Sequence, residues 1–172
     1  MKLIIFSGLP GAGKSALAEA VGQKLGIPVF AKDWLEATLL RADLTPANPE
    51  KPLGSAGYQL LTVLAERQLR LGQSVILDSV ASTQSIRSTW RTLARQFGAD
   101  WRVVEVLCSD ESLHRARLAT RQRQIPGWHE LTWAEVEHVK SYFAPWDEPH
   151  LVLDTILPFE TNLALALHHC TQ

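Results

Sequence analysis

The sequence has few cysteines and no long apolar run, and each absence excludes a class of protein. Its two cysteines, Cys108 and Cys170, lie far apart without metal-ligand spacing, which argues against a disulfide framework and favours a reducing cytosol. The N-terminal apolar run is too short for a secretory leader, and no stretch approaches the length of a membrane span. We therefore expect a cytoplasmic protein without a membrane partner.

An excess of charge of either sign is also absent. The 17 basic residues nearly balance the 18 acidic ones, so no electrostatic signal predicts a nucleic-acid partner. The six tryptophans are scattered and lack the basic-aromatic interleaving that single-strand binding favours, so packing is the expected role of most. Trp34 and Trp128 are exceptions because they neighbour the candidate site described below. The histidines form no metal constellation, and the oligomeric state is not encoded in any pattern.

Short apolar runs alternate with amphipathic segments of helical length, which predicts an α/β fold with a mostly parallel sheet covered by helices on both faces. The 172 residues fit one domain, 1–172. Strands are expected at 2–7, 29–30, 74–77, 101–108 and 151–153. Helices are expected at 13–25, 34–42, 56–71, 83–97, from about 109 to the break at 124–128, at 132–143 and at 159–169. The proline-rich segment 43–52 is expected to be a loop.

Residues 8–15 read GLPGAGKS and follow the apolar run 3–6 directly. They match the pattern G-x-x-x-x-G-K-[ST], in which glycines let backbone N–H groups approach an anion and the lysine reaches the phosphates. A glycine-rich turn that binds nothing is the alternative, but the strand before and the helix after favour a phosphate cradle. The pattern therefore predicts nucleotide binding by Gly8, Pro10, Gly11, Ala12, Gly13, Lys14 and Ser15.

Asp78 ends the apolar strand at 74–77 and is a candidate ligand of Mg²⁺ together with the Ser15 hydroxyl. The next residue is Ser79, where hydrolytic motor ATPases commonly carry a glutamate that activates water. Its absence favours transfer of the phosphoryl group to a bound acceptor. The alternative is that Asp78 caps the following turn.

Asp33 follows the second expected strand, at the sheet edge where ligands bind in open α/β folds. An ionised carboxylate at this position would orient an acceptor hydroxyl and take its proton late in a loose phosphoryl-transfer transition state. The competing interpretation is that Asp33 is the N-cap of a helix beginning at Trp34. One residue can serve both purposes.

Arginines gather in the segment that precedes the break at 124–128. A mobile lid at about 115–131 would bring one guanidinium over the phosphates. Arg121, at the edge of the break, is the first candidate, and Arg117 shares its helix face at i, i+4 spacing. The alternative is that such arginines are solvated or paired with neighbours such as Glu111. The candidate lid arginines are Arg115, Arg117, Arg121 and Arg123.

Arg87 is a further basic residue, in the helix expected at 83–97. It is a candidate for contacting a phosphate group on the acceptor, against the alternative of an ordinary surface arginine.

These residues resemble the small P-loop kinases grouped with polynucleotide 5′-kinases, zeta toxins and chloramphenicol phosphotransferases. They are more similar still to the bacterial AAA-domain-type ATP-binding proteins regarded as predicted kinases. The matching motifs are GLPGAGKS at 8–15, FAKD at 30–33, G-x-x-x-Y-x-L-L at 54–61, SVILDS at 74–79, HRARLATR at 114–121 and LVLD at 151–154. The resemblance implies a three-layer P-loop NTPase fold with a five-stranded sheet and a helical lid. It also implies ATP with Mg²⁺ as donor, Asp33 at the acceptor-activating position and Arg121 near the nucleotide.

The sequence departs from polynucleotide kinases at one informative position. Those enzymes carry an arginine three residues beyond the catalytic aspartate, and this chain has Glu36 there. The predicted function is therefore an ATP-dependent kinase acting on a hydroxyl of a small molecule, with catalytic residues Lys14, Asp33 and Arg121. Two alternatives stay open: a nucleotide-binding switch or regulatory ATPase with the 43–52 loop as partner surface, and a zeta-toxin-like kinase of nucleotide sugars.

Overall fold

The computed structural model describes residues 1–44 and 53–172. These residues form a five-stranded sheet in the order β2-β3-β1-β4-β5, and every pair of neighbouring strands is parallel. The strands are β1 (Lys2–Ser7), β2 (Val29–Ala31), β3 (Val75–Asp78), β4 (Asp100–Leu107) and β5 (Leu151–Asp154). The expectation of a mostly parallel sheet is confirmed.

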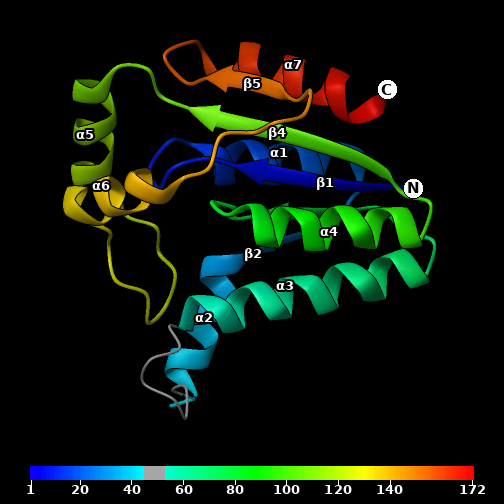
Figure 1. The fold of residues 1–172 in the computed structure, drawn as a ribbon. Coiled ribbons are helices and arrows are strands. Elements are labelled where there is room, and N and C mark those ends of the chain that lie inside the picture. Colours follow the sequence, from blue (N-terminus) through cyan, green and yellow to red (C-terminus); the bar gives the residue numbers. More distant parts are fainter. Residues whose placement is uncertain (45–52) are drawn as a thin grey trace.

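The helices cover both faces of the sheet, so the molecule has three layers (Figure 1). They are α1 (Lys14–Leu25), α2 (Lys32–Arg41), α3 (Leu53–Arg70), α4 (Gln84–Gln96), α5 (Glu111–Thr120), α6 (Trp133–Tyr142) and α7 (Phe159–Thr171). Helices α1 and α7 pack on one face, and α3 and α4 on the other. Helices α5 and α6 lie beyond the carboxyl ends of the strands, where the arrowheads in Figure 1 point.

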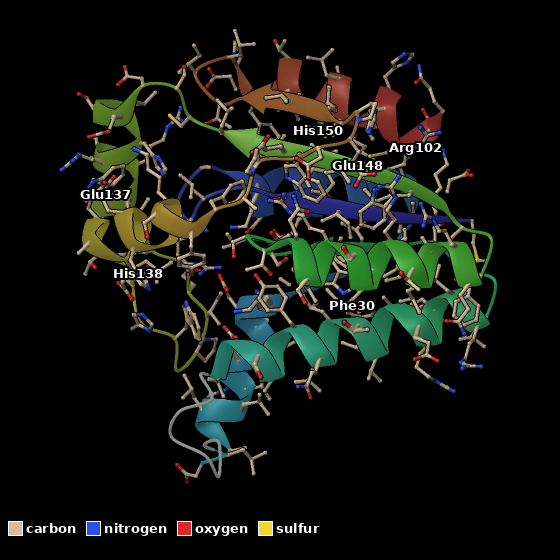
Figure 2. The ribbon with its side chains drawn as sticks, viewed as in Figure 1. Phe30, Arg102, Glu137, His138, Glu148 and His150 are labelled. Atoms are coloured by element: carbon tan, nitrogen blue, oxygen red, sulfur yellow. The ribbon has the colours of Figure 1, made fainter. Side chains whose placement is uncertain are left out.

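The period-two alternation of β1 explains the two-sided core. Ile4 and Phe6 join the cluster under α1 and α7, whereas Leu3 and Ile5 join the cluster under α3 and α4. All four side chains are fully buried, as expected for the central strand of a parallel sheet with both faces covered. Phe30 of β2 packs against the second cluster (Figure 2).

Two helices begin earlier than the sequence predicts. Helix α2 starts at Lys32, two residues before the expected start, because the chain passes from β2 into the helix without a loop. Helix α3 starts at Leu53, before the expected residue 56. Apart from Asp43 and Leu44, the loop expected at 43–52 lies outside the described residues. No helix within 1–44 and 53–172 has the length and apolar character needed to cross a membrane.

The starts of α5 and α6 agree with the sequence signals. The Asp110 side chain accepts a hydrogen bond from the Leu113 N–H at 2.9 Å, and Thr132 and Glu135 form the expected capping box. The connection between these helices, residues 121–132, is irregular and lies at the carboxyl edge of the sheet. We refer to residues 121–132 as the α5–α6 connection.

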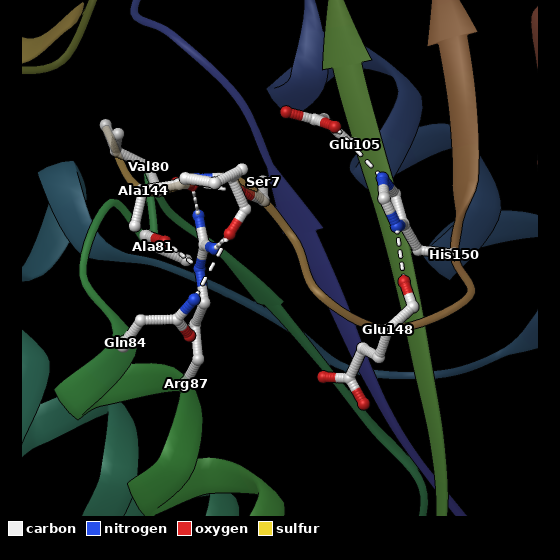
Figure 3. A network of polar contacts seen from close by, with 10 residues as sticks. Ser7, Val80, Ala81, Gln84, Arg87, Glu105, Ala144, Glu148 and His150 are labelled. Carbon is white, nitrogen blue, oxygen red and sulfur yellow. Dashed lines mark hydrogen bonds and ion pairs between the residues drawn. The ribbon is translucent and has the colours of Figure 1, made fainter.

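The segment from Phe143 to His150 crosses back from α6 to β5 and is held by a network of polar contacts (Figure 3). Arg87 donates hydrogen bonds of 2.7 Å to the carbonyl oxygens of Ala81, Ala144 and Pro145. His150 contacts a carboxylate oxygen of Glu105 at 3.0 Å through Nε2.

The expectation that Arg87 contacts an acceptor phosphate is wrong. Its side chain is buried among backbone carbonyls, with 3% of the residue exposed, and its guanidinium lies 3.8 Å from the centre of the Trp146 ring. The hydrogen bonds that the Arg87 guanidinium donates all go to backbone carbonyl oxygens and stabilise the fold. A guanidinium fits because it presents several N–H groups in one plane to carbonyls from two segments.

Arg87→Met is therefore expected to lower the free energy of unfolding by about 3 kcal/mol, because charge-assisted hydrogen bonds are lost and buried carbonyl oxygens keep no partner. Urea denaturation followed by circular dichroism measures this change. Arg95→Gln, on the exposed face of the same helix, is the control and should leave the midpoint within experimental error. Equal urea midpoints for Arg87→Met and the native protein would contradict a stabilising role of Arg87.

Candidate active site

The loop between β1 and α1 is built on three glycines with positive φ: Gly8 (+143°), Gly11 (+83°) and Gly13 (+98°). At Gly8 the requirement is absolute, because a Cβ there would lie 2.0 Å from the carbonyl oxygen of Val106. Gly13 directly precedes α1 in a left-handed conformation. The loop therefore brings backbone N–H groups to the positive end of α1, as an anion cradle requires.

A contact from α5 supports this loop. His114 is buried, and its Nε2 lies 2.8 Å from the carbonyl oxygen of Pro10. The ring packs edge-on against Trp133 of α6. His114 opens the HRARLATR motif at 114–121, but sequence reasoning gave its side chain no role. His114 reaches the loop because α5 follows β4, and β4 lies next to β1 in the sheet.

Lys14 and Asp78 are both buried at the centre of the site. Burial lowers the pKa of Lys14, and the carboxylates of Asp78 and Asp33 oppose that shift. Burial likewise raises the pKa of Asp78, opposed by the charge of Lys14 and by hydrogen bonding from the Ser15 side chain. Each group therefore needs the opposite charge nearby to stay ionised.

Asp78 and Ser15 also fit a magnesium ion. Oδ1 of Asp78 is buried and makes no hydrogen bond among the described residues, and such an orphaned carboxylate oxygen suits a hard cation. Within residues 1–44 and 53–172, no group of three or more His, Cys, Asp or Glu gathers around a common point. An ion held here would rely on Asp78, Ser15, water and phosphate oxygens, as Mg²⁺ commonly does.

Asp33 lies in the first turn of α2, two residues after the end of β2. The N-cap of the helix is Ala31, with no side-chain cap, so the interpretation of Asp33 as the N-cap is wrong. Burial alone would raise the pKa of Asp33, but the charges of Lys14 and Arg123 outweigh it and hold the pKa below its usual range. Asp33 is therefore ionised at neutral pH.

A cavity of about 410 Å³ lies between Asp78 and the α5–α6 connection. Its lining combines the start of α1, the ends of β2 and β3 and the connection itself: Ser15, Ala16, Glu19, Ala31, Trp34, Asp78, Arg121, Gln122, Arg123, Gln124 and Ile125. Trp34, noted from the sequence, is part of the wall. The cavity offers room for a small acceptor beside the phosphate loop.

The structure separates the arginines that the sequence groups together. Arg121 and Arg123 line the cavity, and burial together with the neighbouring Arg123 lowers the pKa of Arg121. Arg123 forms an ion pair with Asp33. Arg115 instead faces outward, pairs with Glu111 and stacks on the Trp133 ring.

Arg117 lies on the other flank of the phosphate loop. It donates hydrogen bonds of 3.0 Å to the hydroxyl and carbonyl oxygens of Thr155, and both residues line a second cavity of about 220 Å³. The remaining lining residues are Gly11, Gly13, Ala16, Leu17, Leu157, Phe159 and Asn162. Sequence reasoning missed Thr155, although its place directly after the LVLD strand was the available signal.

Glu36 does not join the cavity. Its carboxylate lies 2.6 Å from the Lys32 ammonium, and it packs so closely on Gly57 of α3 that a Cβ there would lie 2.6 Å from its Oε1. Glu36 therefore belongs to the contact between α2 and α3. Where polynucleotide kinases carry an arginine, this chain therefore has a glutamate, Glu36, that packs between α2 and α3.

Known proteins are similar to this chain in sequence and in fold. Residues 3–146 match the family of the AAA domain. An uncharacterized protein of Mycobacterium tuberculosis is 28% identical over 98% of this chain. The chain spans 34% of the length of that protein.

Solved structures share the fold. A sugar kinase from Janibacter sp. HTCC2649 superposes with a TM-score of 0.73 at 18% identity, over 99% of this chain and 95% of that one. The APS kinase CysC of Mycobacterium tuberculosis, in complex with AMPPNP and APS, superposes with a TM-score of 0.68 at 21% identity, over 99% and 98%. The α/β fold of P-loop NTPases predicted from the sequence is thereby confirmed.

Proposed function

The chain belongs to the AAA domain family and is a P-loop kinase-like protein, and on that premise we propose that it transfers the γ-phosphate of ATP to a hydroxyl group of a small molecule. One observation carries the proposal. The charge of the buried loop lysine, Lys14, is balanced by two carboxylates, Asp78 and Asp33, and Asp78 lines a cavity large enough for an acceptor.

The residues of the loop, Gly8 to Ser15, bind the phosphates in this proposal. The cavity beside Arg117 and Thr155 receives the nucleoside, because its walls are mainly apolar and it adjoins Gly11 and Gly13. The acceptor occupies the cavity beside Asp33. Residues 115–131 act as the lid, with Arg121 closest to the transferred group.

The reaction is an in-line displacement. The acceptor oxygen attacks the γ-phosphorus, the bond from phosphorus to the β,γ-bridging oxygen breaks, and ADP leaves with that electron pair. Asp33 orients the hydroxyl and accepts its proton as the new bond completes. Lys14 and Arg121 stabilise negative charge on the transferring oxygens. A magnesium ion held by Ser15 and Asp78 supplies further charge neutralisation when bound.

The residue after Asp78 supports transfer rather than hydrolysis. Ser79 is buried and carries no carboxylate that would activate water. The structural neighbours include a sugar kinase and an APS kinase in complex with AMPPNP and APS, which supports ATP as donor and a small hydroxyl compound as acceptor.

Phosphoryl transfer from γ-labelled ATP tests the proposal. Purified protein with Mg²⁺ is incubated with neutral sugars, sugar acids, nucleosides and hydroxylated amino acids, and labelled products are separated from phosphate. At least one acceptor should be labelled. The proposal is overturned if no acceptor is labelled while ATP hydrolysis proceeds equally in the native protein and in Asp33→Asn.

A further inference from the structure

Arg123 is the residue of the α5–α6 connection that reaches α2. Its guanidinium Nη1 pairs with Oδ2 of Asp33, across ninety positions of sequence. The Arg123 side chain is 6% exposed and the Asp33 side chain 24% exposed. The ion pair therefore lies largely out of water, at the wall of the acceptor cavity.

We propose that Arg123 is a positioning residue, which holds the Asp33 carboxylate ionised and fixed toward the acceptor cavity before any ligand binds. This inference rests on the proposed function of Asp33, and it adds a residue that no motif in the sequence marks. Arg123 acts through Asp33, whereas Arg121 and Lys14 act on the phosphates.

The backbone around Arg123 is anchored, so that its side chain approaches Asp33 in a defined way. The Arg123 N–H donates to Oε1 of Glu130 at 2.8 Å, and Ile125 is buried. Gly127 lies against the Arg41 side chain of α2, where a Cβ would come within 2.6 Å. The connection is thus docked on the same helix that carries Asp33.

The environment of Asp33 explains why a second cation is needed. Lys14 is shared between Asp33 and Asp78, so it does not neutralise Asp33 alone. The charged groups that act on Asp33 or feel its charge are Lys14, Lys32, Glu36, Asp78, Arg121 and Arg123. Of the cations among these, Arg123 is the one that makes a direct ion pair with Asp33.

The Arg123 guanidinium can donate a further hydrogen bond besides its ion pair with Asp33. Its Nε is buried and has no hydrogen-bond partner among the described residues. A buried donor without a partner is costly, and an oxygen atom of a ligand in the cavity would satisfy it. The ion pair need not break for the acceptor to bind.

The test compares Arg123→Gln and Arg123→Lys with the native protein, using ¹³C NMR titration of the aspartate carboxyl groups without nucleotide. The Asp33 resonance is identified by its absence in Asp33→Asn. In the native protein Asp33 should titrate below the ordinary range of aspartate, about 3.9. Its midpoint should move upward in Arg123→Gln and less far in Arg123→Lys. Arg70→Gln, which breaks an exposed pair with Glu66, should not move it.

An unchanged Asp33 midpoint in a folded Arg123→Gln overturns the inference. An arginine that stabilises the fold without acting on the Asp33 carboxylate would lower the melting temperature when replaced and leave the titration of Asp33 unchanged. The NMR result does not depend on knowing the acceptor, so it stands or falls separately from the proposed function.

Kinetics provide the second readout once an acceptor is identified. Arg123→Gln should lower kcat about tenfold at neutral pH, since loss of an orienting partner costs less than loss of the reacting group itself. The acid limb of the pH profile should move to higher pH, with partial recovery in Arg123→Lys. The inference is refuted, and the kinase function survives, if the native protein labels an acceptor but Arg123→Gln shifts neither the acid limb of the pH profile nor the NMR midpoint of Asp33.

Discussion

Replacing Asp33 with asparagine is expected to reduce phosphoryl transfer by about 10²- to 10⁴-fold, the range that a positioned acid–base group contributes. Asparagine is isosteric, but it cannot accept the hydroxyl proton. The loss should fall on kcat, with the KM for ATP changed little, because Asp33 pairs with Arg123, which lines the cavity proposed for the acceptor. Steady-state kinetics with an acceptor found by γ-label transfer measures both constants.

Asp100→Asn is the matched control, because Asp100 is exposed at the start of β4. It should leave kcat and KM unchanged. A native kcat in Asp33→Asn would show that the hydroxyl is oriented by another group, and Asp33 would then be a purely structural partner of Arg123.

Asp33→Asn is also expected to lower the free energy of unfolding by an amount that depends on pH. The folded-state pKa of Asp33 is depressed, so its ionised form stabilises the fold above the unfolded-state pKa, and this contribution disappears as pH falls through the folded-state value. Asp33→Asn leaves the buried Arg123 without its counter-ion, at a cost of about 3 kcal/mol near neutral pH. The difference in unfolding free energy between the two proteins should shrink as the solution is acidified.

Replacing Lys14 with methionine is expected to lower kcat by about 10²- to 10³-fold, because one preorganised charge facing the transferred phosphoryl group is removed. Methionine is chosen because it fills much of the same buried space. Binding of a fluorescent ATP analogue should weaken as well, since the proposed function has Lys14 contact the phosphates of ATP in the ground state. Rapid-quench transfer assays and fluorescence titration measure these two effects.

Lys24→Met, near the exposed carboxyl end of the same helix, controls for the loss of a lysine as such. It should behave as the native protein in both assays. If Lys14→Met transfers the phosphoryl group at the native rate, Lys14 takes no part in the reaction and the loop only binds the nucleotide.

Much of the fold could be predicted because parallel strands carry a local signature. The apolar runs around Ile4, Ile76 and Val104 are buried on both faces, so their hydrophobicity is continuous and readable. The Thr132–Glu135 capping box was equally readable, because it depends on contacts within a single turn. The start of α2 was misjudged because the transition from strand to helix at Ala31 uses no capping side chain.

The site was only partly predictable. The phosphate loop follows β1, Asp33 lies two residues after β2 and Asp78 ends β3, and the carboxyl ends of parallel strands share one edge of the sheet. Arg87 was misassigned because an arginine on an amphipathic helix gives no indication of whether it meets solvent or backbone carbonyls. Arg123 could not be separated from Arg121, since the residues that distinguish them, Asp33 above all, are distant in sequence.

The sequence by itself determined that this chain forms a phosphate loop at the head of a parallel α/β sheet, because glycine conformation and strand hydrophobicity are properties of short segments. Only the tertiary structure decided which charges meet. It exposes the buried Lys14 to the charges of Asp78 and Asp33, buries Arg87 under the Phe143–His150 segment, and brings Arg123 to Asp33. Such pairings depend on how elements far apart in the chain pack, and packing is fixed by the whole core rather than by any one motif.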